Sequence, residues 1–110
     1  MPDNTAALAQ AVKANVQERA SQLAFEWRWD AAHGETTDPA WALRLAAELE
    51  AVEVWLAPDG YIKARTATGR YTAYEMLEGA AADLLSADKF ATADLDWRGG
   101  DHGVAVLKTT

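Results

Sequence analysis

The chain has 110 residues, which is enough for one domain with a single core but not for a core plus a separate catalytic lobe. Seventeen acidic residues against ten basic ones give a net charge of −7. This charge argues against a general binder of DNA or of anionic membranes, because such proteins attract phosphates with a basic field. The lack of cysteine excludes disulfides, thiol catalysis and zinc sites built on cysteine.

The expected location follows from two further absences in the sequence. No apolar run approaches the length of a membrane-spanning helix, and the first ten residues lack the basic and then apolar layout of a signal peptide. We therefore expect a cytoplasmic protein without membrane association. The sequence also contains no catalytic motif, so we expect neither enzymatic activity nor a cofactor.

The first predicted element is one long helix over about Asn4 to Ala32, a stretch without glycine or proline that Gly34 is expected to end. Apolar residues recur there every three or four positions and form the stripe expected to face the core: Leu8, Val12, Val16, Ala20, Leu23 and Trp27. A second set falls on a different face: Glu18, Gln22, Phe25 and Trp29. These two outlying aromatic residues need a cover, either from another element of the domain or from a second chain.

A second helix is predicted to begin at Asp38, with its side chain as the N-cap and Pro39 in the first helical position. Its buried edge is expected to comprise Trp41, Leu45 and Leu49. Three acidic residues then cluster where the helix dipole favours cations: Glu48, Glu50 and Glu53. A local rule broken without compensation indicates a functional surface.

A hairpin is predicted next, with strands over Val52–Ala57 and Tyr61–Thr66. A three-residue loop with Gly60 in the left-handed conformation fits the chemistry of the facing residues. It pairs Val54 with Ala64 and Leu56 with Ile62 on one face, and Glu53 with Arg65 and Trp55 with Lys63 on the other. This register joins apolar residues, opposes charges and places the Lys63 cation over an indole.

A third helix is predicted from about Ala73 to Ser86, with a capping box that begins at Thr72. A competing interpretation makes Arg70–Glu75 a strand. Gly79 inside the helix costs about 1 kcal/mol relative to alanine unless another group packs close to it.

A last hairpin is predicted to close the chain around a two-residue turn at Gly100-Asp101. This turn sets Trp97 opposite Val104 and Leu95 opposite Val106, on the inner face of the sheet. The order helix, helix, hairpin, helix, hairpin predicts an α+β fold. We expect a single domain over residues 1–110, with a small, mainly antiparallel sheet packed on the helices.

The leading functional hypothesis is a small acidic, non-enzymatic protein-binding module. It would act as a stoichiometric inhibitor or adaptor, of the kind found in immunity proteins and phage anti-defence proteins, with carboxylates standing in for nucleic-acid phosphates. The partner is then a larger, basic protein. The expected partner-binding residues are Glu48, Glu50, Glu53, Asp94 and Asp96 for charge, with Phe25 and Trp29 as apolar anchors. A homodimer through the two aromatic residues is also compatible with this pattern.

Two alternatives belong to other functional classes. In the first, Asp96, Asp101 and His102 in the last hairpin hold a divalent metal or perform acid–base chemistry. In the second, Lys63, Arg65 and Arg70 bind RNA or single-stranded DNA. Direct binding to nucleic acid is disfavoured, because acidic segments flank the basic residues and repel a phosphate backbone.

Overall fold

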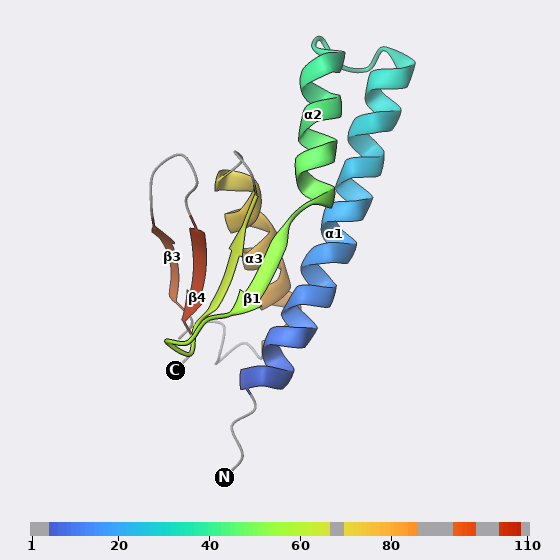
Figure 1. Ribbon diagram of the computed structural model, residues 1–110. Helices are drawn as coiled ribbons and strands as arrows, with labels where there is room; N and C mark the ends of the chain where they lie inside the picture. Colours follow the sequence, from blue (N-terminus) through green and yellow to red (C-terminus); the bar gives the residue numbers. More distant parts are fainter. Residues whose placement is uncertain (1–4, 67–69, 86–93, 99–103, 109–110) are drawn as a thin grey trace.

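Three helices and a four-stranded antiparallel sheet make up the fold, in the predicted order of two helices, a hairpin, a helix and a hairpin (Figure 1). The computed structural model describes residues 5–66, 70–85, 94–98 and 104–108. The elements are α1 (Thr5–His33), α2 (Pro39–Glu50), β1 (Glu53–Leu56), β2 (Ile62–Arg65), α3 (Arg70–Leu84), β3 (Asp94–Arg98) and β4 (Val104–Lys108). The predicted α+β class is therefore confirmed.

The core lies between one face of the sheet and two helices, α3 and the N-terminal half of α1. The strand order is β1-β2-β4-β3, which places β1 nearest α1 and makes β3 the opposite edge (Figure 1). Fully buried side chains come from both layers: Val12, Val16 and Leu77 from the helices, and Ile62 and Leu107 from the strands. This apolar contact holds the sheet and helices together as one layered unit.

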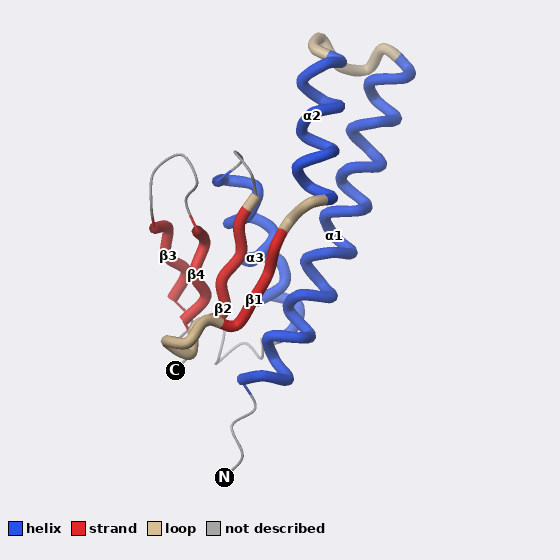
Figure 2. The backbone as a smooth tube through the Cα atoms, viewed as in Figure 1, coloured by secondary structure: helices blue, strands red, loops and turns tan. Residues whose placement is uncertain are grey.

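The C-terminal half of α1 extends past the sheet, and α2 runs antiparallel beside it (Figure 2). We call this pair, residues 20–50, the helical arm. Its interface is built from small side chains that let the helices approach closely: Ala20, Ala24, Ala42 and Ala46 are all at most 1% exposed. The molecule is accordingly elongated, with extents of 53 × 27 × 20 Å.

Both predicted helix boundaries in the arm are confirmed. Gly34 has a φ of +71° and ends α1, and the Glu35 amide donates to the Asp30 carbonyl at 2.9 Å. Asp38 caps α2, because its Oδ1 accepts from the Trp41 amide at 3.0 Å, with Pro39 in the first turn. The connection between the two helices is therefore defined by local chemistry at both ends.

The first hairpin has the predicted register, with Glu53 opposite Arg65 and Trp55 opposite Lys63. Gly60 has a φ of +88°, as the three-residue loop requires. The cation over the Trp55 indole was assigned wrongly, however. It is Arg65, whose Cζ lies 5.6 Å from the ring centroid, because the Lys63 ammonium instead binds Asp59 in the turn at 2.9 Å.

The predicted register of the last hairpin is wrong by one residue. Trp97 pairs with Ala105 and Leu95 pairs with Leu107, so the proposed two-residue turn does not hold. The reason is that β4 also pairs with β2, where Leu107 faces Ile62 and contributes to the core. A shift of one residue exchanges the two faces of a strand, and the core contact with β2 decides which face of β4 points inward.

The start of the third helix also differs from the prediction. Helix α3 begins at Arg70, so Thr72 lies within the helix and is not its N-cap, and the competing strand over Arg70–Glu75 is wrong. Arginine is a good helix former, and no glycine or proline between Arg70 and Ala73 stops the helix from extending.

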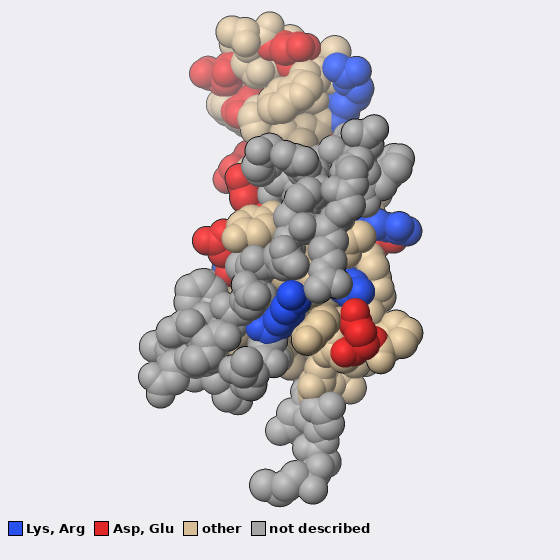
Figure 3. Space-filling model, turned by 90° about the vertical axis from the view of Figure 1, so that its left-hand side faces the viewer, with Lys and Arg blue, Asp and Glu red and all other residues tan. Residues whose placement is uncertain are grey.

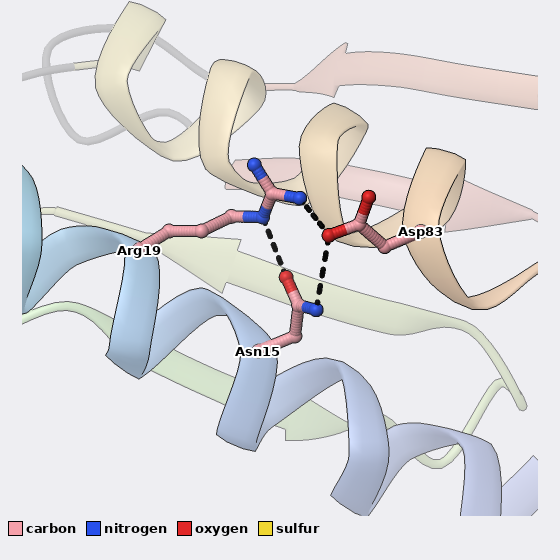
Figure 4. Close-up of polar contacts among 3 residues, drawn as sticks. All are labelled: Asn15, Arg19 and Asp83. Carbon is pink, nitrogen blue, oxygen red and sulfur yellow. Dashed lines mark hydrogen bonds and ion pairs between the residues drawn. The ribbon is translucent and has the colours of Figure 1, made fainter.

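Gly79 allows α1 to dock closely on α3. A Cβ atom at this position would lie only 2.8 Å from Nη1 of Arg19, so the guanidinium lies directly against the helix. Arg19 also forms an ion pair with Asp83, and its Nε donates to Oδ1 of Asn15 at 2.6 Å (Figure 4). The low helix propensity of the glycine is thus offset by a close contact between the two helices.

This contact predicts coupling between Gly79 and Arg19. In an Arg19→Ala background, Gly79→Ala should stabilise the fold by about 1 kcal/mol, the propensity difference between the two residues. With Arg19 present the gain should shrink or reverse, because the new methyl group displaces the guanidinium. Urea unfolding of the four proteins measures the coupling. An equal effect of Gly79→Ala in both backgrounds would contradict the proposed role of the glycine.

Candidate functional site

Two large aromatic residues lie on the side of α1 that points away from the rest of the arm. Phe25 is 68% exposed and Trp29 is 46% exposed. At about 100° per residue, both point away from Ala20 and Ala24, which face α2. We call the surface formed by Glu18, Gln22, Phe25 and Trp29 the outer face of α1. No other described helix or strand covers it, so the cover that the sequence led us to expect does not come from another element of the described part of the domain.

The ring of Trp29 is held in place by the end of its own helix. His33 stacks on it with the ring centroids 4.0 Å apart and the planes 15° from parallel. Nδ1 of His33 also lies 2.8 Å from the Trp29 carbonyl oxygen, at hydrogen-bonding distance. This role of His33 was not predicted from the sequence, although its spacing of four residues from Trp29 was a signal for it. A restrained indole loses less conformational entropy when a partner binds it.

Trp27, by contrast, serves the interior of the arm. It packs edge-to-face on Trp41 with ring centroids 5.1 Å apart and contacts the apolar core. Its Nε1 is buried and has no hydrogen-bond partner among the described residues. Trp27 and Trp29 are therefore close in sequence but differ in role, since Trp27 is half-buried against the core whereas Trp29 is 46% exposed.

The arm carries more acidic than basic residues. Figure 3 shows carboxylate-bearing residues at its free end, with lysine or arginine atoms to one side. On α1, the side chains of Glu18, Glu26 and Asp30 form no ion pair or hydrogen bond with any residue that the structure describes. Their charge is not compensated within that part of the chain, and two of the three lie on or beside the outer face of α1.

The glutamates predicted to steer a partner do not form one surface. Glu50 binds Arg28 in an ion pair, and Glu53 binds Nε of Arg65 at 2.8 Å. Glu48 and Glu50 are two residues apart on α2, which turns them about 200° from each other. The three glutamates are close in sequence but lie on different sides of the molecule, and Glu50 and Glu53 are each paired with an arginine.

The two aspartates predicted for the same role lie in the edge strand β3. In the backbone register Asp94 pairs with Lys108 and Asp96 with Val106. Asp101 and His102, the other residues of the metal hypothesis, fall outside the described residues. Within the described ranges, no group of three histidine, aspartate or glutamate residues is arranged to hold a metal ion.

Two of the three basic residues that were candidates for nucleic-acid binding form ion pairs with carboxylates of the same chain. Lys63 binds Asp59, and Arg65 binds Glu53 while lying over Trp55. Arg70 opens α3. A phosphate backbone would have to compete with these carboxylates for the lysine and the arginine.

Comparison with protein-family models, with curated protein sequences and with solved structures finds no match for this chain. None of the helices that the structure describes combines the length and the apolar character needed to cross a bilayer.

The contrast between the aromatic residues predicts two different effects on stability. Phe25→Ala should change the free energy of unfolding by less than about 0.5 kcal/mol, because the ring is exposed. Trp27→Ala should cost about 2 to 4 kcal/mol, because it leaves a gap between the two helices of the arm. Chemical denaturation of both variants measures the difference. A loss of comparable size in Phe25→Ala would show that the outer face of α1 is covered in the free protein.

Proposed function

We propose that this chain is a non-enzymatic protein-binding module that engages a larger, basic partner through the outer face of α1. The observation that carries the proposal is the exposure of Phe25 and Trp29, side by side on a helix face that no described element covers. Tryptophan and other large aromatic side chains are enriched where proteins bind one another, because they bury much area in few contacts.

The shape of the molecule supports this proposal. The arm projects from the sheet, so its outer face can enter a cleft or lie across a partner without a clash with the rest of the domain (Figure 1). Helix α2 and the capped connection brace α1 from behind. A rigid, projecting surface suits a stoichiometric inhibitor or an adaptor, both of which act through shape alone.

The charge of the chain supports a basic partner. The net charge is −7, and Glu18, Glu26 and Asp30 have no compensating cation among the described residues. We assign the steering role to these three carboxylates, since Glu50 and Glu53 are engaged by arginines. An inhibitor whose carboxylates replace nucleic-acid phosphates, as in immunity and anti-defence proteins, is one form of such a module.

Capture of the partner tests the proposal. The tagged chain should retain one stoichiometric protein from a host lysate, and rising salt should release it because the attraction is partly electrostatic. A Phe25→Ser/Trp29→Ser variant should lose that protein. The matched control is Leu56→Ser/Leu84→Ser, which removes two exposed leucines elsewhere, 38% and 39% exposed, and should retain it.

Circular dichroism of both variants establishes that they are folded before capture is compared. Equal retention by the wild type and the Phe25→Ser/Trp29→Ser variant would contradict the assignment of the binding surface. Failure to retain any protein at low salt would contradict the proposed function itself.

A further inference from the structure

The outer face of α1 has the residue spacing of a helix-packing surface. Its members, Glu18, Gln22, Phe25 and Trp29, follow one another at intervals of four, three and four residues along one helix. This alternation is the pattern with which two helices pack side by side, because it keeps one row of side chains facing the neighbour. The row rises about 16 Å over its eleven steps, or about three helical turns.

The charges beside this row are one-sided. Glu18 begins the row, and Glu26 lies on the flank of the row, three residues before Trp29. Neither carboxylate has an ion-pair partner among the described residues. Arg28, the nearest cation on the opposite flank, is engaged by Glu50 of α2. The row therefore combines an apolar end with a negative rim whose charge α2 does not neutralise.

We propose that the occupant of the outer face of α1 is a basic amphipathic helix of the partner protein. Its apolar stripe would pack on Phe25 and Trp29, and lysine or arginine beside the stripe would meet Glu18 and Glu26. This inference rests on the proposed function and specifies the partner's binding element. A second copy of the chain is a poorer fit, because it would bring the same carboxylates and another charge of −7.

Two synthetic peptides provide the direct test. Both are amphipathic helices of about three heptads with leucine at the core positions, and they differ only in having lysine or glutamate at the flanking positions. In calorimetric titration of the full chain, the lysine peptide should bind one to one and more weakly at higher salt. The glutamate peptide should not bind. The Phe25→Ala/Trp29→Ala variant should bind the lysine peptide with at least tenfold lower affinity.

A matched pair of charge reversals separates local from general attraction. Glu18→Lys/Glu26→Lys and Glu75→Lys/Glu78→Lys change the net charge by the same amount, and the second pair lies on the exposed side of α3. The first pair should lower the affinity for the lysine peptide about tenfold, and the second pair should lower it less than threefold. Equal effects would show a non-specific attraction and would overturn the inference.

Two other outcomes would also overturn it. One is equal binding of the two peptides, or binding that is indifferent to Phe25→Ala/Trp29→Ala. The other is self-association that the same variant abolishes, measured by sedimentation at rising concentration, which would make a second copy the occupant. If lysate capture still depends on Phe25 and Trp29 while the lysine peptide fails to bind, the proposed function stands and only the helical partner is rejected.

Discussion

The length of the first helix is the constraint on which the rest of this structure depends. Helix α1 has 29 residues and rises about 43 Å, whereas the strands, with four or five residues each, span only about 13 to 17 Å. The sheet and α3 can therefore cover only part of α1. The C-terminal half of α1 has an alanine-rich stripe that only α2 can bury. The helical arm follows from that requirement.

The arm also explains why two aromatic residues stay exposed. Helix α2 covers one side of the C-terminal half of α1, and the sheet lies beside the N-terminal half (Figure 1). No described element is left to cover Phe25 and Trp29 on the opposite side. Large apolar side chains are costly to keep in water, and contiguous exposed examples mark interaction surfaces more often than isolated ones do. Because His33 restrains the Trp29 ring, this surface is also partly ordered before any partner arrives.

Much of the fold could be predicted from local chemistry in the sequence. Gly34 and Asp38 marked helix ends through left-handed backbone and side-chain capping, and Gly60 set the register of the first hairpin. The register of the last hairpin could not be obtained in this way, because it depends on the pairing of β4 with β2, which is distant in sequence. Local rules predict elements well and contacts between distant strands poorly.

In the candidate site, too, local patterns were predicted correctly and contacts between distant segments were not. The helical period alone separated Phe25 and Trp29 from the core stripe of α1. The acidic block at the end of α2 was misleading, because the partners of its members, Arg28 and Arg65, come from other elements. An ion pair between distant segments leaves no trace in the sequence around either residue, so the uncompensated charge had to be located in the structure.

Hydroxyl-radical footprinting of the free chain distinguishes an exposed outer face of α1 from a covered one, since it measures the accessibility of each aromatic side chain. We expect rapid oxidation of Phe25 and Trp29 at low protein concentration and slow oxidation of Trp27. Phe25 and Trp29 should become protected when the captured partner is added. Protection of Phe25 and Trp29 in the free chain to the level of Trp27 would contradict this expectation. So would unchanged oxidation of both residues in the complex.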